Sequence, residues 1–300
     1  MNNNTYAEAL LELQTLGDFL RWAVTEFERV PVFYGHGADN AWDEALMLIL
    51  PTLCLPPVMA QYVLNSKLLR SEKEKLAELI HLRTHDRMPT AYLTRQAWFA
   101  GEKYYVDERV LIPRSPLAEL IEQQFAPWIS EDYPVNAIVD IGTGSGCIAC
   151  ACALAFPDAQ VDAVDISPDA LAVAKNNVEQ HKLQSRVHLI RSNVFSELKN
   201  KRYDIIVSNP PYVDAEEMAD LPPEYHHEPR LGLAAGQDGL DCLRLILKEA
   251  GKHLTTQGIL VVEVGFSAPA LAEAFPDIPF TWVELERGGE GVFVVTAADL

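Results

Sequence analysis

Four consecutive residues, Asn209-Pro210-Pro211-Tyr212, combine groups that can bind a flat molecule carrying an NH2 group. The Asn209 side-chain oxygen and the Pro210 carbonyl accept hydrogen bonds, and an NH2 group offers two donors. The two prolines stiffen the backbone because each of them fixes φ, and Tyr212 adds an aromatic surface. We expect all four residues to bind the substrate, with Asn209, Pro210 and Tyr212 acting in the reaction. The alternative is a strand that simply ends in a tight turn.

A second stretch, Asp140-Ile141-Gly142-Thr143-Gly144-Ser145-Gly146, carries glycine at alternate positions. Glycine adopts the backbone angles of a tight turn and lets a ligand approach the main chain closely. The spacing departs from the Gly-x-Gly-x-x-Gly of dinucleotide-binding loops, because the third glycine comes one residue early. The loop therefore argues against a dinucleotide, and Asp140 is placed to hold a cationic amino group.

Three residues further along could complete a ligand site. Asp165 follows the glycine loop at the distance where an acid accepts hydrogen bonds from both hydroxyls of a ribose. Asn193 and Val194 follow the next expected strand and are placed to flank an adenine, although an ordinary loop explains these two residues nearly as well.

The elements that position these residues form an α/β pattern. Short apolar runs alternate with helical segments from Val135 onward, which predicts a largely parallel sheet with helices on both faces. Ligands bind at the carboxyl ends of such strands, where the glycine loop, Asp165 and Asn209 fall. Gly288-Gly289 predicts a hairpin between the last two strands and hence one antiparallel strand at the edge. The seven expected strands are 137–141, 161–166, 187–191, 203–208, 258–265, 280–286 and 291–296.

The amino-terminal part has a different pattern. Residues 5–28 carry apolar side chains at helical spacing, Asn40 can cap a second helix, and Ser71 opens a possible capping box for a helix that reaches about His85. Aromatic and β-branched residues around Gly101 predict a hairpin, and a helix is expected from Leu117 to about Trp128. We divide the chain into a small helical domain, a linking hairpin and an α/β domain, at residues 1–95, 96–115 and 116–300.

Composition narrows the class of protein. The 300 residues carry a net charge of −19, and 29 of the 43 acidic residues but 14 of the 24 basic residues lie after Asp107. Such a surface repels a phosphate backbone and attracts basic partners, unless the acidity serves only solubility. The sequence shows neither an apolar run near 18 residues nor an amino-terminal signal. We expect a soluble, cytoplasmic protein.

Cysteine usage points to reduced thiols. The five cysteines have no framework spacing, which fits the cytosol. Cys147 and Cys150 form a Cys-x-x-Cys on the helix after the glycine loop, where packing is the better explanation than zinc binding or redox chemistry. We predict no metal site.

The glycine loop, Asp165 and the Asn209–Tyr212 motif together resemble class I S-adenosylmethionine-dependent methyltransferases. The resemblance implies a Rossmann-like, doubly wound, mostly parallel seven-stranded sheet, with S-adenosylmethionine as methyl donor and S-adenosylhomocysteine as product. It assigns the glycine loop and Asp165 to the cofactor. With the residues above, the expected cofactor site is Asp140, Gly142, Thr143, Gly144, Ser145, Gly146, Asp165, Asn193, Val194 and Asn209.

The Asn-Pro-Pro-Tyr motif occurs in two related groups, nucleic-acid amino-methyltransferases and protein glutamine methyltransferases. The helical domain, the hairpin, the stretch Arg109 to Arg114 and Glu228-Pro229-Arg230 resemble the glutamine group. Release-factor enzymes of that group usually read Pro-Arg-Pro, whereas this chain has Pro113-Arg114-Ser115-Pro116. That departure, with the stretch Pro89–Thr94, is similar to the branch that methylates a glutamine of ribosomal protein L-three.

This resemblance implies a basic ribosomal protein as the acceptor, and neither DNA nor a membrane as a partner. The alternatives are methylation of peptide-chain release factors, amino-methylation of a nucleic-acid base, and a ribosome-assembly binding module that only keeps a cofactor pocket. Glu228 and the His226-His227 pair follow the motif in a proline-containing loop that is placed to border the substrate. For the two histidines a solvated loop is the favoured explanation.

Overall fold

The computed structural model describes residues 3–56, 58 and 60–300, and the chain divides into two compact units. The helical unit comprises the residues up to Ala97 together with Pro222–His227, and the sheet unit comprises Trp98–Leu221 and Glu228–Leu300. The short segment Pro222–His227, which lies beyond the Asn209–Tyr212 motif in the sequence, therefore belongs to the helical unit.

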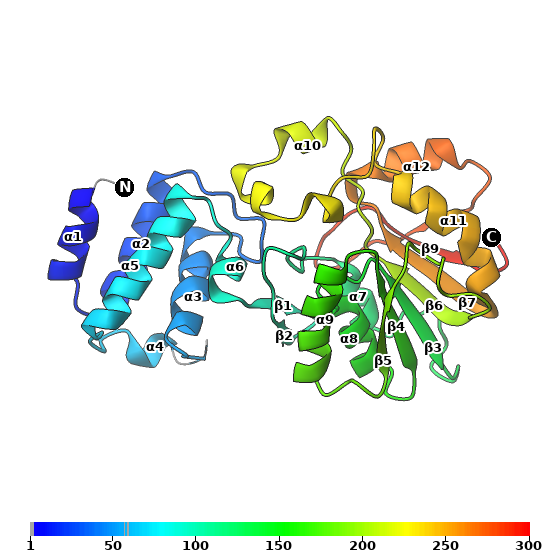
Figure 1. Cartoon of the computed structure of the whole chain (residues 1–300), viewed down its shortest axis with the longest axis horizontal. Coiled ribbons are helices and arrows are strands. Elements are labelled where there is room, and N and C mark those ends of the chain that lie inside the picture. The colour runs from blue at the N-terminus through cyan, green and yellow to red at the C-terminus, as the bar shows by residue number, and fades with distance from the viewer. Residues whose placement is uncertain (1–2, 57, 59) are drawn as a thin grey trace. The chain divides into compact units, whose positions relative to one another are not determined.

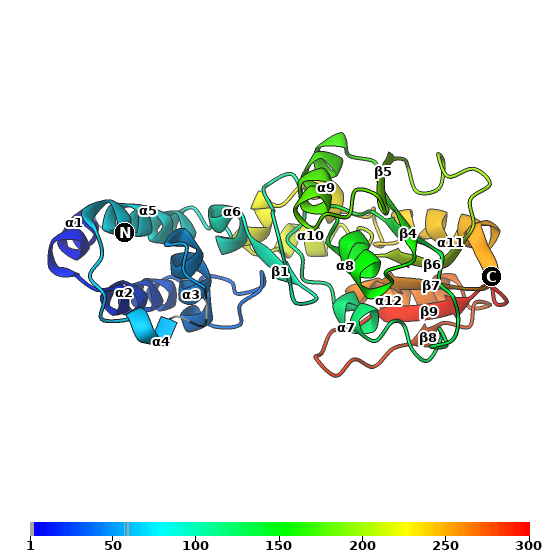
Figure 2. The same cartoon turned by 90° about the horizontal axis from the view of Figure 1, so that it is seen from below.

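Figure 2 shows the helices of the helical unit. Helices α2, α3 and α5 supply most of its buried apolar core. Phe19, Leu48 and Ile80 are completely buried between them. Thr15 separates the first two helices, because its hydroxyl accepts a hydrogen bond from Asp18 N and begins a new helix there. The elements of this unit are α1 (Asn3–Glu12), α2 (Leu16–Arg29), α3 (Ala41–Thr52), α4 (Ala60–Val63), α5 (Arg70–His85), α6 (Thr90–Thr94) and η2 (Pro223–His227).

Two helix starts were expected from capping residues. Asn40 caps α3 as predicted, since its side-chain oxygen accepts from Trp42 N and Asp43 N. The capping box at Ser71 was wrong: the N-cap of α5 is Leu69, two residues before Ser71, and the Glu72 carboxylate accepts the N–H of Leu69 at 2.7 Å.

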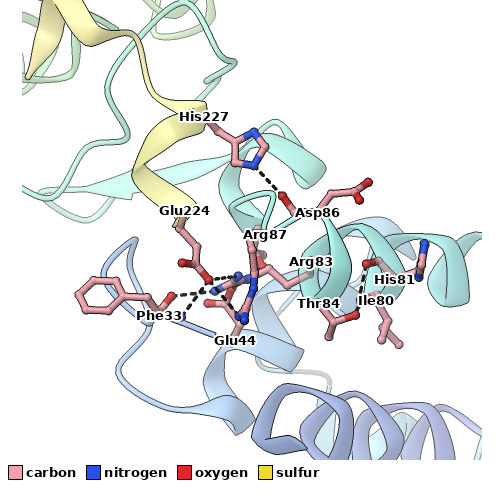
Figure 3. A network of polar contacts seen from close by, with 11 residues as sticks. Phe33, Glu44, Ile80, His81, Arg83, Thr84, Asp86, Arg87, Glu224 and His227 are labelled. Carbon is pink, nitrogen blue, oxygen red and sulfur yellow. Dashed lines mark hydrogen bonds and ion pairs between the residues drawn. The ribbon is translucent and has the colours of Figure 1, made fainter. Parts of the chain in front are cut away.

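A buried ion-pair network holds η2 in the helical unit (Figure 3). The Glu224 carboxylate accepts hydrogen bonds from Arg83 at 3.0 Å and from Phe33 N at 2.9 Å. Arg83 also bonds Glu44 at 2.5 Å, and Glu44 accepts the Thr90 hydroxyl at 2.6 Å. Glu224, Arg83 and Glu44 are 0%, 1% and 3% exposed, so all three charges are buried together.

The two histidines beside Glu224 have different surroundings. His226 is exposed, as expected of a solvated loop. His227 is partly exposed and donates a hydrogen bond from Nε2 to the carbonyl of Asp86 at 2.7 Å.

The sheet unit contains a seven-stranded sheet in the order β5-β4-β3-β6-β7-β9-β8, and a separate two-stranded sheet β1-β2 at the expected hairpin (Figure 1). Its strands are β1 (Ala97–Phe99), whose first residue is counted with the helical unit, β2 (Glu102–Tyr104), β3 (Ala137–Ile141), β4 (Gln160–Asp165), β5 (Val187–Arg191), β6 (Tyr203–Ser208), β7 (Leu254–Glu263), β8 (Thr281–Trp282) and β9 (Val292–Thr296). Its helices are α7 (Leu117–Glu122), α8 (Cys147–Ala155), α9 (Pro168–Gln180), α10 (Glu217–Asp220), η3 (Arg230–Gly232), α11 (Asp241–His253), η4 (Gly265–Ser267) and α12 (Ala268–Ala274).

Strands β5, β4, β3, β6 and β7 are parallel, which confirms the predicted doubly wound sheet. The antiparallel strand is β9, but it lies between β7 and β8 rather than at the edge, so the predicted position was wrong. The physical reason is burial: Val292–Val295 are all buried, whereas both residues of β8 are exposed. The more apolar strand takes the inner place.

Alternate strand residues face two apolar layers, as expected for a sheet covered on both faces. One layer packs the sheet against α7, α8 and α9, and the other packs it against α11 and α12. Helix α7 ends at Glu122 and not near Trp128, because Gln124 and Phe125 adopt φ of 53° and 56°, outside the helical region. In the described part of the chain, no helix has the length and apolar character needed to cross a membrane.

Candidate active site

The glycine loop connects β3 to α8 in a backbone conformation that favours glycine. Gly142, Gly144 and Gly146 have φ of 76°, 53° and 78°. A Cβ on Gly146 would lie 3.0 Å from the Cβ of Ala174, so glycine permits the close packing of α8 on α9. A Cβ on Gly144 would meet nothing within 4 Å, and this side of the loop is open.

Asp165 closes the loop from the end of β4. Its carboxylate accepts hydrogen bonds from Gly144 N at 2.9 Å and Ser167 N at 2.8 Å. Burial raises the pKa of Asp165, and these backbone bonds offset part of that rise. Each carboxylate oxygen retains room for a further donor, so Asp165 can hold both the loop and a ligand.

Asp140 lies beneath the loop and is completely buried. One carboxylate oxygen accepts from the Thr143 hydroxyl at 2.5 Å and from Ala149 N at 3.1 Å. The other, Oδ1, is buried without a hydrogen-bond partner among the described residues. Burial raises the pKa of Asp140 to about 7, and the nearby charge of Asp165 adds to that rise. The sheet unit therefore contains a buried carboxyl oxygen that could accept a hydrogen bond from a ligand.

Asn209 follows β6, the neighbour of β3, and this pairing brings the motif beside the glycine loop. Ser208 pairs with Ile141, and its hydroxyl donates to the Ile141 carbonyl at 2.7 Å. A Cβ on Gly142 would lie 3.9 Å from the Asn209 carbonyl oxygen. The Asn209 side chain is half-buried and makes no hydrogen bond to the residues that the structure describes. Its amide is available to a ligand.

A cavity of about 310 Å³ joins these features within the sheet unit. Among the predicted site residues, its walls contain Gly142, Gly144, Asp165, Asn193, Val194, Asn209 and Pro211. Asp140, Thr143, Ser145, Gly146, Pro210 and Tyr212 do not line it. The structure thus brings the glycine loop, the two strand-end residues and the motif to one cavity, while Asp140 lies behind its wall.

Sequence reasoning missed several parts of the wall. Arg109, Val110 and Leu111 come from the segment that we had treated as a linker, and Ile166 follows Asp165 directly. The segment after Glu228, which the sequence had marked only through the Glu-Pro-Arg stretch, contributes Pro229, Leu231, Gly232, Ala234 and Ala235. Apart from Arg109 these residues are apolar or glycine and carry no chemical signature, so only the fold could reveal them.

Tyr212 is held away from the cavity. Its hydroxyl donates to the Glu263 carboxylate at 2.9 Å, and its carbonyl accepts the Ser267 hydroxyl at 2.8 Å. Ser115 donates to the other oxygen of Glu263 at 2.5 Å. Burial raises the pKa of Glu263, and the two hydroxyls offset part of the rise.

Glu228, which we had placed beside the substrate, is buried and bonded within the sheet unit. Its carboxylate accepts Ile112 N and Arg114, both at 3.0 Å. Cys147 is also buried, and burial raises the pKa of its thiol to about 12. This thiol stays protonated at neutral pH, which favours packing over redox chemistry.

Known proteins resemble this chain both in sequence and in fold. The family model "Methyltransferase small domain" matches residues 123–221. The ribosomal protein uL3 glutamine methyltransferase of Neisseria gonorrhoeae is 48% identical over 295 residues, covering 98% of each chain. The protein of the same name from Francisella tularensis subsp. tularensis is 46% identical over 288 residues, covering 96% of this chain and 92% of its own.

Solved structures support the fold alone. The catalytic domain of hMettl16 in complex with the MAT2A 3'UTR hairpin 6 superposes with a TM-score of 0.50 at 17% identity, covering 75% of this chain and 81% of that one. The match with hairpin 1 has the same TM-score and identity, and covers 80% of that chain.

The sheet order, the glycine loop and these matches define a methyltransferase of the class I fold, which uses a methyl donor of the S-adenosylmethionine type. The fold and enzyme class predicted from the sequence are confirmed. At 46–48% identity over nearly the whole chain, the protein belongs to the family of ribosomal protein uL3 glutamine methyltransferases.

Proposed function

We propose that this protein transfers the methyl group of S-adenosylmethionine to the side-chain amide nitrogen of a glutamine in ribosomal protein uL3. The observation that carries the proposal is Asn209, whose unengaged amide lines the same cavity as the glycine loop and Asp165. The names of the two relatives support uL3 as the acceptor. Among the residues that the structure describes, the wall of the cavity contains none that favours a nucleic-acid base or a release factor over this acceptor.

The residues of the cavity fit the proposed cofactor. Asp165 offers acceptors for the hydroxyls of a ribose, beside the open space at Gly144. Ile166 and Val194 supply apolar wall for an adenine. When bound, S-adenosylmethionine supplies an electrophilic methyl group on a cationic sulfur. The unpartnered oxygen of Asp140 gives the site negative potential behind the glycine loop, which favours a cationic ligand.

Asn209 and Pro210 would orient the reacting amide. An amide nitrogen is a weak nucleophile, because its lone pair is delocalised into the carbonyl. The Asn209 side-chain oxygen and the Pro210 carbonyl each accept one N–H of the glutamine side chain. These two hydrogen bonds turn the nitrogen lone pair toward the methyl group and stabilise positive charge as it develops on nitrogen. The methylated nitrogen is then acidic enough to lose its proton to water, so no general base is required.

The charge of the chain agrees with a basic acceptor. With a net charge of −19, the protein attracts a basic ribosomal protein and disfavours free nucleic acid. We assign its place of action to the cytoplasm, where ribosomal proteins are made.

The test is methylation by the Asn209→Ala variant. Turnover on purified uL3 should fall about 100-fold or more, as when one oriented hydrogen-bonding group is removed from an active site. The affinity for S-adenosylhomocysteine, measured by calorimetry, should change less. Asn209→Asp keeps the acceptor oxygens and should lose less activity than Asn209→Ala.

The acceptor is tested by offering labelled S-adenosylmethionine with uL3, release factors, DNA or RNA. Label on uL3, located to a glutamine by mass spectrometry, supports the proposal. Label on release factors or nucleic acid, or wild-type turnover by Asn209→Ala, would contradict it.

A further inference from the structure

One feature of the sheet unit has no place in the reaction described above, namely the buried carboxylate of Glu263. It lies at the end of β7 and is 5% exposed. Two hydroxyls donate to it, from Tyr212 of the motif at 2.9 Å and from Ser115 at 2.5 Å. Glu263 thus joins the motif to the stretch Pro113-Arg114-Ser115-Pro116, which the sequence marked without giving it a role.

Tyr212 has little freedom around this hydrogen bond. A Cβ on Gly265 would lie 2.7 Å from the Tyr212 ring, and a Cβ on Gly239 would lie 2.4 Å from the Tyr212 carbonyl oxygen. Ser267 donates to that same carbonyl. The backbone, the ring and the hydroxyl of Tyr212 are each fixed by a different contact, three residues after Asn209.

The segment Ile112–Ser115 also holds the chain where it re-enters the sheet unit. Ile112 N and the Arg114 guanidinium donate to Glu228, and Ser115 reaches Tyr212 through Glu263. The four residues of this segment are therefore tied both to the motif, through Glu263, and to Glu228, the first residue of the sheet unit after the segment Pro222–His227.

Stability alone does not explain Glu263. Its two side-chain hydrogen bonds come from neutral hydroxyls, and a buried carboxylate without a cation bonded to it costs free energy relative to a neutral group. Arg114 acts on it only as a nearby charge. What Glu263 holds in place is the carboxyl end of the Asn209–Tyr212 motif.

We propose that Glu263 is a positioning residue for methyl transfer. Its carboxylate accepts hydrogen bonds from the Tyr212 and Ser115 hydroxyls, and these bonds hold the Asn209–Tyr212 motif against the segment Ile112–Ser115. The inference rests on the proposed role of Asn209 and names the group that sets its position. Methyl transfer needs a lone pair aimed in line with the methyl group, and misplacement of about 1 Å can cost about 100-fold in rate.

The test compares Tyr212→Phe, Glu263→Gln and the double variant in methylation of uL3. Tyr212→Phe removes the hydroxyl and keeps the ring, so any packing of the ring on the substrate is preserved. We expect kcat to fall about 10-fold for Tyr212→Phe and less for Glu263→Gln, which still accepts one hydroxyl. KM for uL3 and the affinity for S-adenosylhomocysteine should stay within about twofold, since the binding walls are intact. The double variant should be no slower than Tyr212→Phe, because both changes break one connection.

Tyr133→Phe is the matched control. The Tyr133 hydroxyl donates at 2.8 Å to Asp204, a buried acid at the opposite end of β6 from Asn209. This variant loses an equivalent tyrosine–carboxylate bond away from the cavity, so its melting temperature should fall while its kcat stays unchanged.

Three results would overturn the inference: Tyr212→Phe keeping wild-type kcat, Tyr212→Phe losing no more kcat than Tyr133→Phe, or the losses of the two single variants multiplying in the double variant. Asn209→Ala separates these results from failure of the proposed function. If Asn209→Ala is inactive while Tyr212→Phe is normal, only the role of Glu263 is lost. If Asn209→Ala is fully active, the proposed function itself is wrong.

Discussion

Two sites of this protein, one in each unit, bury carboxylates in opposite ways. In the helical unit, Glu224 shares a buried site with Arg83, and Arg83 also pairs with Glu44. Burial by itself would raise the pKa of Glu224, but the hydrogen bonds from Phe33 N and Arg83 outweigh it, so this pKa lies below its ordinary value. The carboxylate remains charged because an arginine neutralises it.

In the sheet unit, Asp140 and Glu263 are buried with hydroxyl and backbone N–H donors and no arginine or lysine bonded to them among the described residues. Burial raises the pKa of both groups, to about 7 for Asp140. The comparison shows that buried carboxyl side chains have different roles in the two sites. The helical unit uses paired charge to hold η2, and the sheet unit likewise pairs Glu228 with Arg114. Asp140 and Glu263, by contrast, are held by hydroxyl and backbone N–H donors behind the glycine loop and beside the motif.

The largest expected effect comes from removing the neutralising charge. Arg83→Met would leave Glu44 buried without its cation and Glu224 with only the longer contact to Arg87 at 3.6 Å, and breaking a buried pair in this way costs about 3–5 kcal/mol. We expect the helical unit to unfold at a lower temperature, measured by circular dichroism and differential scanning calorimetry.

Arg70→Met is the control, because the Arg70–Glu74 pair lies on the surface of the same unit with an Arg70 side chain 90% exposed. Exposed pairs contribute about 0–1 kcal/mol, so this variant should melt close to wild type. Equal melting temperatures for the two variants would show that Arg83 does not carry the network.

The sequence predicted the strands and loops of the sheet unit better than it predicted the buried contacts of Glu224 and Glu263. Hydrophobic periodicity places β3, β4 and β6, and the glycine loop, Asp165 and Asn209 follow from it because each ends a strand. These signals are local, lying within a few residues of the elements that they define.

The Glu224–Arg83 pair joins residues 141 positions apart, and Glu263 joins Ser115 at 148. No local pattern marks such partners, since an isolated glutamate reads as solvated surface. For the same reason Pro222–His227 gave no sign of belonging to the helical unit, and Arg109 to Leu111 gave no sign of lining the cavity.

A second prediction concerns the pH dependence of stability that the buried Asp140 carboxyl group gives to the sheet unit. Unfolded aspartate titrates near pH 4, and folding raises the pKa of Asp140 to about 7, so the folded chain holds this proton more tightly. The stability that results is complete below about pH 4 and is lost as the pH rises through about 7. Asp140→Asn removes this loss, and at pH 8 the variant should be more stable than wild type by at most about 4 kcal/mol.

The measurement is the melting temperature of the cofactor-free protein at pH 5, 6, 7 and 8. Asp204→Asn, in a buried acid on the neighbouring strand, leaves Asp140 intact and should keep the decline of wild type. A wild-type profile without this decline, or the same decline in Asp140→Asn, would contradict the assignment to Asp140.

The smallest effect tests the comparison directly by making one glutamate in each unit neutral. Glu224→Gln keeps an oxygen for Phe33 N but leaves part of the Arg83 charge unmet, at a cost of about 1–3 kcal/mol. Glu263→Gln faces hydroxyls, which both donate and accept, so the new NH2 group can donate to Ser115 or Tyr212. The free energy of unfolding should then stay within about 1 kcal/mol of wild type, measured by urea denaturation. Glutamine is a neutral isostere of glutamate, so it should destabilise only the site where the glutamate is bonded to a cation. If both variants lost the same stability, the distinction between charge-paired and hydroxyl-held carboxylates would have no energetic basis.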